Sequence, residues 1–372
     1  MPEGQAIHRH ARILTGLFAG EPVALSSPQG RFASGAELLA GLTPLPAEAW
    51  GKHFFMPFAD AQREAKEVER RHADNDARAE GAAESDASPS TGMSSARPGE
   101  DGPVHTSNRH SVHPGERDSV QAGKRDSVHQ GDSAPIRAGD SDPVRLGDDG
   151  PLWLHIHLGL YGKWTFSGPA AQWLPANLRG GGLASPIAEP GPNVRLRLET
   201  PQIAADLSGP TRCEVLDGAG VRRVLTKLGP DPVRNEPGDR ERFVEAVRSR
   251  RAPIGQLVMD QSISAGPGNI YRADCLFRVG ISPLRPGQRV SAARAAALWD
   301  DLAAAMSADL DDGVIVTVPD ELRPNPVPPG DEEAARFAVY HRTGRPCLRC
   351  GATVAEKDMA GRRLFWCPGC QR

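Results

Sequence analysis

The chain begins Met1-Pro2-Glu3-Gly4, which places a compact nucleophile beside a carboxylic acid. A small second residue such as proline permits removal of Met1, and Pro2 then carries a free secondary amine. An α-amino group titrates near pH 8, at about 7.7–8.0, so much of it is unprotonated at neutral pH. Secondary amines form iminium ions with carbonyl-like carbons, and Glu3 can act as a general acid or base. This start predicts Schiff-base chemistry at the N-terminus; an unreactive terminus is the alternative.

Two Cys-x-x-Cys pairs near the other end of the chain predict a metal site. Sixteen residues separate the first pair, Cys347 and Cys350, from the second pair, Cys367 and Cys370. Four thiolates at this spacing form a closed tetrahedral site for one structural Zn²⁺ ion, with Zn–S distances of about 2.3 Å. Because sulfur fills all four positions, we expect the zinc to hold a hairpin and not to activate water. Free or redox-active thiols are the alternative.

Two segments have the composition of phosphate-binding sites. Residues Arg362–Trp366 lie between the cysteine pairs and predict a basic hairpin tip, which suits phosphate contact. A solvated basic turn is the alternative there. In the segment Gln261–Tyr271, Gly266 and Gly268 permit tight turns, and Asn269 is placed to cap the following helix. Unpaired N–H groups at such a helix start bind anions, although an ordinary helix-turn-helix explains the same pattern.

The spacing of apolar residues divides the chain into three parts. Ile7, Ala11, Leu14 and Phe18 recur at helical spacing, which predicts a helix over residues 5–18. Strands are expected in the N-terminal part, the first two in one sheet, and together they favour a two-sheet sandwich: residues 50–58, 152–166, 193–198 and 202–207. Helices are expected in the middle part, over residues 241–250, 254–261, 270–278 and 291–311. The predicted domains are residues 1–217, 218–325 and 335–372.

A long insertion separates the first two predicted strands. Residues 60–150 hold 19 acidic and 12 basic residues and no aromatic residue, whereas the rest of the chain has a net charge of +4. Such a segment cannot bury enough apolar surface to offset its conformational entropy, so we expect disorder at a hairpin tip. Five successive octapeptides within Arg109–Asp148 each have Val or Ile at position four and Gly at position seven. A linker without function is one interpretation, and a tether for a protein partner is the other.

Composition also bounds the class of protein. The length of 372 residues suggests two or three domains. No apolar run of about 18 residues and no signal-peptide core is present, so no membrane span is expected. Six cysteines in a chain of this length do not form a disulfide scaffold. We therefore expect a cytoplasmic protein with reduced thiols, in which Cys213 and Cys275 are buried and outside the metal site.

These features together resemble the Fpg/Nei family of DNA glycosylases, particularly its bacterial endonuclease VIII-like members. The matching segments occur in family order and cover the chain outside the insertion: Met1–Gly4, Trp50–His53, His155–Gly162, Gly229–Asp231, Asp260–Tyr271 and Cys347–Cys370. The resemblance implies an α+β multidomain fold. Its parts are an N-terminal β-sandwich, a helix–two-turn–helix domain and a C-terminal zinc-finger β-hairpin, with DNA in the cleft between them.

The resemblance also implies the roles of catalytic residues. Pro2 attacks C1′ of the damaged nucleoside, the base departs, and β- and then δ-elimination cuts the strand. Glu3 donates and accepts protons at the sugar. Lys52 binds the phosphate beside the lesion and takes part in catalysis; a surface lysine on a strand is the alternative.

The same resemblance implies how DNA is held. His157 lies near the DNA backbone, Asn269 binds phosphate from the helix–two-turn–helix, and Arg362 binds phosphate from the zinc finger. An enzyme acting on a base flips it out of the stack, and a wedge side chain often fills the gap. Leu160 and Tyr161 occupy the family's void-filling loop, although strand core is the other interpretation of these two residues.

The resulting prediction is a bifunctional DNA glycosylase/AP lyase that acts on oxidised bases, preferring pyrimidines, in damaged double-stranded DNA. A monomer in a bacterial cytoplasm is expected. Ala6 stands where the family often has a second glutamate, so an AP lyase with little glycosylase activity is an alternative. A non-catalytic damage-binding protein and a zinc-ribbon factor for transcription or RNA are others; the first conflicts with Pro2, Glu3 and Lys52, and the second leaves the N-terminus unexplained.

Overall fold

The computed structural model describes residues 2–60, 150–180, 186–311 and 313–372. The predicted disorder and the octapeptide repeats concern residues 61–149, outside the described residues, and Met1 lies outside them too. Within the described part, no helix is both long enough and apolar enough to cross a membrane.

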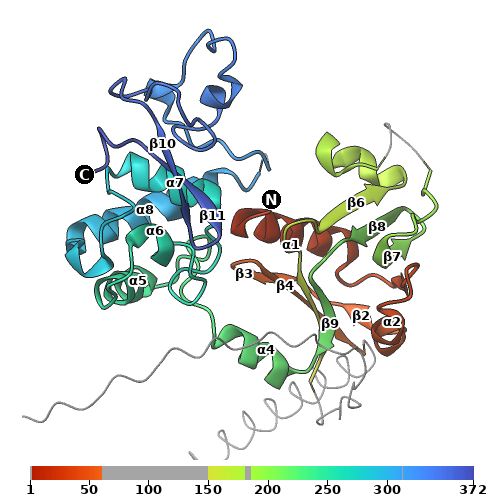
Figure 1. Cartoon of the computed structure of the whole chain (residues 1–372). Coiled ribbons are helices and arrows are strands. Elements are labelled where there is room, and N and C mark those ends of the chain that lie inside the picture. Colours follow the sequence, from red (N-terminus) through yellow and green to blue (C-terminus); the bar gives the residue numbers. More distant parts are fainter. Residues whose placement is uncertain (1, 61–149, 181–185, 312) are drawn as a thin grey trace, which may run out of the picture. The chain divides into compact units, whose positions relative to one another are not determined.

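The N-terminal part contains the predicted sandwich. After helix α1 (Gly4–Phe18), two antiparallel sheets form (Figure 1). One sheet has the order β1-β7-β8-β6, with β1 at Ala24–Ser26, β7 at Val194–Thr200, β8 at Ile203–Ser208 and β6 at Lys163–Ser167. The other has the order β2-β4-β5-β9 with β3 beside β4: β2 at Thr43–Pro44, β3 at Glu48–Trp50, β4 at His53–Ala59, β5 at Leu152–His157 and β9 at Arg212–Leu216. Helix α2 (Ala33–Leu39) follows β1, and short 3₁₀ turns follow β6 at Pro169–Trp173 and Ala176–Leu178.

One hydrophobic cluster joins α1 to both sheets. The predicted apolar stripe of α1 is confirmed, because Ile7, Ala11, Leu14 and Phe18 are all buried. Alternate residues of β4 enter the same cluster, because successive side chains of a strand point to opposite faces of the sheet. Burial of each large side chain stabilises the fold by about 1.5–3 kcal/mol, so this cluster supplies the rigid support for both ends of α1.

The long insertion interrupts a hairpin, as predicted. Phe58 of β4 pairs with Leu152 of β5, and His53 pairs with His157 at the other end. The prediction of one strand over residues 152–166 was wrong, because the chain turns at 158–162 and β6 joins the other sheet. Gly159 adopts a left-handed backbone with φ +68°, and a Cβ there would meet Thr211 at 2.2 Å. This turn therefore requires glycine and ends the strand.

The helical part follows β9. Its elements are α4 (Gly218–Leu225), α5 (Asp239–Arg248), α6 (Ile254–Leu257), α7 (Asn269–Arg278) and α8 (Ala292–Ala308). Helix α4 packs against β5 and β9, whereas α5, α7 and α8 share a separate hydrophobic cluster. The helix predicted over residues 254–261 ends at Leu257, because the next turn tightens and the Asp260 side chain accepts the Ser262 N–H at 3.0 Å. A 3₁₀ turn spans Gly287–Arg289, and two more, Asp320–Leu322 and Glu332–Ala335, precede the C-terminal module.

The C-terminal module is a two-stranded antiparallel hairpin beside α7. Strand β10 (Ala355–Met359) pairs with β11 (Arg362–Trp366) (Figure 1). Phe277 of α7 and Phe365 of β11 share a hydrophobic cluster. The buried carboxylate of Asp274 on α7 accepts the backbone N–H groups of Ala338, Val339 and Tyr340 at 2.7–3.1 Å. These contacts fix the module to α7.

One buried histidine, His10, and one half-buried histidine, His53, predict a loss of stability in mild acid. Burial lowers the pKa of His10 to about 4 and that of His53 to about 3, whereas both titrate near 6.5 when unfolded. The unfolded chain therefore binds more protons below pH 6.5, and the free energy of unfolding falls as the pH drops from there towards 4. We expect His10→Leu to remove up to about 2 kcal/mol of the decrease between pH 7 and pH 5, since one pKa unit corresponds to about 1.4 kcal/mol. Urea unfolding at both pH values measures this, and an equal decrease in both proteins contradicts it.

Candidate active site

Three distant segments meet at the start of the chain. The Gly4 N–H donates to the Gly266 carbonyl at 3.0 Å. The Lys52 ammonium, in the turn between β3 and β4, donates to the Pro267 carbonyl at 2.8 Å. The N-terminus and this turn therefore both lie against the glycine-rich loop that precedes α7.

Glycines make this close approach possible. A Cβ at Gly4 would lie 2.7 Å from the Gly266 Cα, and one at Gly51 would lie 2.8 Å from the Ala265 Cβ. Gly51 also has a left-handed backbone with φ +57°. A Cβ at Gly268 would lie only 2.4 Å from the Glu3 Cδ. The backbone of the loop can therefore reach Glu3 only where no side chain intervenes.

Glu3 caps helix α7 from the other end of the sequence. Its side chain is fully buried, and its carboxylate accepts the N–H of Gly268 at 2.7 Å and that of Ile270 at 2.9 Å. The prediction that Asn269 caps α7 was wrong, because Gly268 holds the cap position and offers no side chain. A carboxylate at a helix start is stabilised by the unpaired N–H groups and by the helix dipole. The anion at this helix start is thus a side chain of the protein itself.

Opposite charges meet around Glu3. Burial raises the pKa of Glu3, and this is opposed by Lys52 and by the N–H groups of α7. Burial lowers the pKa of Lys52. The nearby Glu3 carboxylate opposes this decrease, and the Arg362 guanidinium adds to it. A buried carboxyl group with a raised pKa, beside a cation, is suited to hold and release a proton. Pro2 is partly exposed and directly precedes this buried group.

The predicted phosphate-binding residues gather around the same loop. The Asn269 Nδ2 group donates to the Arg363 carbonyl at 2.9 Å, which joins α7 to the hairpin. Arg362 begins β11 opposite Met359, at the tip of that hairpin, and its side chain is exposed. His157 ends β5 with its Nδ1 atom 2.9 Å from the Thr211 hydroxyl. The pKa of His157 is lowered mainly by burial and next by the positive charge of Lys52. The imidazole and the Lys52 ammonium are therefore close enough to interact electrostatically.

The two predicted wedge residues are exposed. Leu160 is 47% exposed and Tyr161 is 81% exposed, in the turn between β5 and β6. The interpretation of both as strand core is therefore excluded. A tyrosine that is largely in solvent has its ring available for stacking.

Three further residues organise the site, and the sequence analysis assigned no role to them. Asp231 is buried, accepts the Gly51 N–H at 2.6 Å and lies 2.7 Å from His8. Gln261 accepts the Gly266 N–H at 2.9 Å and donates to Pro267, which shapes the loop. Arg272 donates to Asn269 and to the Arg363 carbonyl. The partners of Asp231 lie 180 and 223 positions away and leave no spacing pattern, so the only signal for these three residues was their place inside or beside the matching segments.

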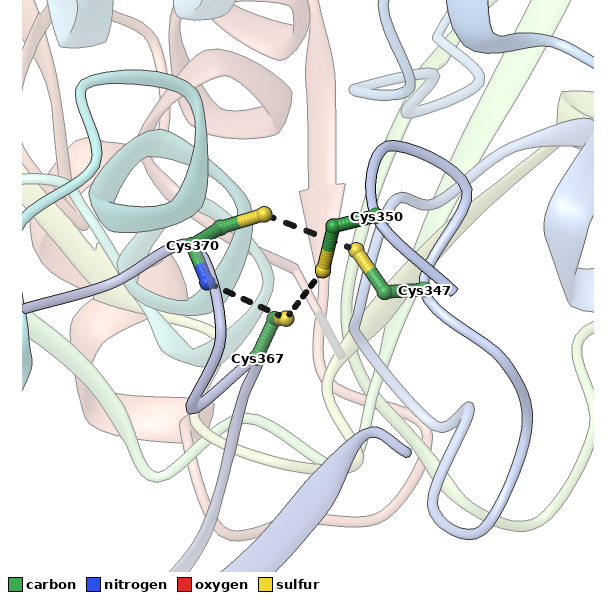
Figure 2. Close-up of side chains that lie close together, drawn as sticks. All are labelled: Cys347, Cys350, Cys367 and Cys370. Carbon is green, nitrogen blue, oxygen red and sulfur yellow. Dashed lines mark hydrogen bonds between the residues drawn. The ribbon is translucent and has the colours of Figure 1, made fainter. Parts of the chain in front are cut away.

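The four cysteines form the predicted cluster. Figure 2 shows Cys347, Cys350, Cys367 and Cys370 directed towards one another, and their sulfur atoms all lie within 4.8 Å. The Cys347–Cys370 and Cys350–Cys367 sulfur distances are 3.8 and 3.5 Å. Tetrahedral thiolates around zinc lie about 3.8 Å apart, so the donor set fits a metal of this kind. Cys275 is buried and Cys213 half-buried, both outside the cluster.

Comparisons with known sequences agree with this arrangement. The family model described as the formamidopyrimidine-DNA glycosylase H2TH domain matches residues 228–319. Endonuclease 8 1 of Mycobacterium bovis is 32% identical over 372 residues, covering 100% of both chains. A formamidopyrimidine-DNA glycosylase of Rhodospirillum rubrum is 36% identical over 231 residues, which is 58% of this chain and 75% of that protein.

Solved structures share the fold. A Lactococcus lactis FPG mutant in complex with Fapy-dG containing DNA has a TM-score of 0.60 and 17% identity, over 100% of both chains. MutM (Fpg) from Thermus thermophilus has a TM-score of 0.58 and 20% identity, over 100% of this chain and 98% of that one. These likenesses agree with the predicted α+β fold of sandwich, helix–two-turn–helix and cysteine-bearing hairpin. From the full-length identity to Endonuclease 8 1, the chain belongs to the Fpg/Nei family of DNA glycosylases.

Proposed function

We propose that the protein is a bifunctional DNA glycosylase/AP lyase that removes oxidised bases, preferably pyrimidines, from double-stranded DNA. The observation that carries this proposal is the buried Glu3 carboxylate, held by two N–H groups of the α7 start directly beside Pro2. Lys52 lies at the same loop and bonds to Pro267. A nucleophile, a proton-transfer group and a cation thus meet where three segments converge.

In the proposed reaction the Pro2 nitrogen forms a bond to C1′, and the bond from C1′ to the base breaks with its electron pair leaving on the base. The proton that the Pro2 nitrogen loses neutralises the departing base. Glu3 donates a proton to the sugar oxygen as the ring opens, which gives an iminium ion at C1′. Glu3 then accepts the C2′ proton, and the 3′ phosphate departs in β-elimination. A second elimination releases the 5′ phosphate. Burial raises the pKa of Glu3, which favours its protonated form for the first transfer, while Lys52 and the N–H groups at the start of α7 favour the carboxylate needed for the second.

Lys52, Asn269, Arg362 and His157 would hold the DNA backbone during these steps. Phosphate contacts position a duplex without reading its sequence, as repair at any position requires. The excess of basic residues outside the insertion favours DNA as the partner, whereas the acidic insertion would repel DNA. A monomeric state, a cytoplasmic location and a protein partner for the insertion stay predictions.

Zinc is the metal that we propose for the cysteine cluster, with one ion held by all four thiolates. Asn269 and Arg272 of α7 both bond to the Arg363 carbonyl of the hairpin. We therefore expect that removing zinc with a strong chelator weakens binding of abasic-site DNA by about tenfold or more, while the sandwich stays folded. Binding and circular dichroism measured on the same sample test this. Cys350→Ser should act like the chelator and Cys213→Ser should not; unchanged binding without zinc contradicts the role of the hairpin.

Replacing Tyr161 should slow excision of damaged bases more than cleavage of abasic sites. Flipping a stacked base costs a few kcal/mol, and one aromatic stacking contact is worth about 1–3 kcal/mol. We expect Tyr161→Ala to slow excision of 5,6-dihydrouracil by about tenfold or more and to change cleavage of a preformed abasic site by less than about threefold. Trp173→Ala is the control, because Trp173 is 83% exposed but lies outside this loop. Equal losses on both substrates would show that Tyr161 does not fill the gap.

Single-turnover incision of three duplexes tests the proposed function. The substrates contain 5,6-dihydrouracil, thymine glycol or an abasic site. Cleavage of all three, with the phosphate ends of β,δ-elimination, supports the proposal. Cleavage of the abasic site alone favours the second candidate, a lyase with little glycosylase activity, which Ala6 keeps open because it carries no second carboxylate. Binding without any cleavage would overturn both enzyme functions.

A further inference from the structure

Arg272 lies at the centre of the contact between α7 and the hairpin. It is the fourth residue of α7, and its side chain is 0% exposed. Its Nη2 group donates to the Asn269 Oδ1 atom and, at 3.0 Å, to the Arg363 carbonyl. One guanidinium nitrogen therefore bonds to Asn269 and to Arg363, and these two residues are also hydrogen-bonded to each other.

We propose that Arg272 is a positioning residue that fixes the Asn269 amide with its NH₂ group towards the DNA phosphate. This inference rests on the proposed function, because it assigns a phosphate to Asn269. An arginine can only donate hydrogen bonds, so the amide must turn its oxygen towards Arg272 and its nitrogen away. An amide nitrogen carries two hydrogens. One bonds to the Arg363 carbonyl at 2.9 Å, and the other is left for a phosphate oxygen.

Without Arg272 the amide of Asn269 would be held only by the Arg363 carbonyl, on the hairpin to which Arg272 also bonds. The amide oxygen and nitrogen have nearly the same shape, so a rotation of about 180° would present an acceptor to the phosphate. Two acceptors repel each other, so the molecules with a rotated amide would lose the hydrogen bond from Asn269 to the phosphate. The charge of the guanidinium strengthens the constraint, since hydrogen bonds with an ionised partner are about twice as strong as neutral ones.

The charges around Arg272 point to an anionic ligand as well. Among the described residues, its Nε and Nη1 atoms have no hydrogen-bond partner, and no carboxylate lies within ion-pair distance of it. Burial and Arg362 lower its pKa to about 10, so it stays a cation at neutral pH. A buried cation without a paired carboxylate costs several kcal/mol. Lys52 and Arg362 add two more positive charges to this region, and the Glu3 carboxylate offsets one charge, so a phosphate at Asn269 would balance the positive charge that remains.

A purely structural role for Arg272 makes a different prediction. If the side chain only ties the hairpin to α7, its removal weakens DNA binding whether or not Asn269 is present. If it positions the amide, its removal matters only while Asn269 is there to be positioned. A double-mutant cycle separates these roles.

The experiment measures the Kd for duplex DNA with a tetrahydrofuran abasic-site analogue, by fluorescence anisotropy with the zinc-loaded full chain. We expect Arg272→Gln and Asn269→Ala each to raise the Kd by about tenfold, the loss of one charge-assisted hydrogen bond. The double variant should be within about twofold of Asn269→Ala. Arg272→Lys, which keeps a charged donor, should recover part of the affinity. Arg240→Gln is the matched control, since Arg240 forms an exposed ion pair with Asp300 away from this contact.

Zinc content and thermal unfolding of each variant keep the outcomes distinct. An unchanged Kd for Arg272→Gln, or additive losses in the double variant, overturns the positioning role while leaving the proposed function intact. If Arg272→Gln does not fold, Arg272→Lys with and without Asn269→Ala supplies the same cycle. A wild-type protein that fails to bind the abasic analogue overturns the proposed function, and this inference with it.

Discussion

A protein that keeps extra residues ahead of Pro2 should form no covalent adduct with abasic DNA. Its rate of cleavage of abasic DNA should fall by at least about 1,000-fold. An extension turns the Pro2 nitrogen into an amide, which has no basic lone pair and cannot form an iminium ion. The contacts of Glu3 with Gly268 and Ile270 need not change, because they involve only its side chain. DNA binding should therefore fall far less than cleavage. Gel shift and single-turnover cleavage on the same preparations measure the two effects.

The same peptide tag placed after Arg372 is the control for this experiment. Arg372 is exposed, so a tag attached there should leave adduct formation and cleavage unchanged. Full cleavage by the N-terminally extended protein, with the extension verified intact by mass spectrometry, would falsify the role of Pro2.

Gly268→Ala should reduce cleavage of both abasic and base-damaged DNA by about 100-fold or more. The new Cβ would lie 2.4 Å from the Glu3 Cδ, a distance that real Cβ contacts do not reach. Either Glu3 leaves the start of α7 or the loop moves, and either displacement separates Glu3 from Pro2. Misplacing a catalytic group by about 1 Å can cost on the order of 100-fold in rate. Single-turnover rates at saturating enzyme isolate the chemical step from binding.

Gly16→Ala is the matched control for Gly268→Ala. Gly16 lies in α1, and an added Cβ there meets nothing within 4 Å. Replacing this helical glycine with alanine should leave the rate unchanged and stabilise the protein by about 0.5–1 kcal/mol. Comparable loss of cleavage in both variants would mean that Gly268 has no special relation to Glu3.

The sequence allowed the architecture to be predicted where local patterns determine it. The apolar spacing of Ile7, Ala11, Leu14 and Phe18 marks one face of α1, and that face is buried. The two Cys-x-x-Cys pairs predicted a cluster that the structure forms. Turns were harder, because the break between β5 and β6 depends on the left-handed backbone of Gly159 against Thr211. That contact involves a residue about fifty positions away, so the neighbouring residues do not reveal it.

The site itself was predicted as a set of residues but not as a geometry. Lys52, Asn269 and Glu3 do converge on one loop. The sequence predicted Asn269 at the cap of α7, whereas Gly268 holds that position and the capping side chain is that of Glu3, 265 positions away. Capping patterns consider only neighbouring residues, so an acceptor from the other end of the chain is invisible to them. Arg272 lies only three positions after Asn269, but its bond to Arg363 depends on how the hairpin packs on α7.

The central claim is that the Pro2 amine is the nucleophile. The most direct measurement traps the protein on abasic DNA with borohydride, digests the adduct and locates the modified residue by mass spectrometry. If Pro2 is the nucleophile, the one modified peptide is the N-terminal peptide. It lacks Met1 and carries the reduced sugar on the Pro2 nitrogen. An adduct on a lysine such as Lys52, or no adduct with abasic DNA that the protein binds, would contradict it.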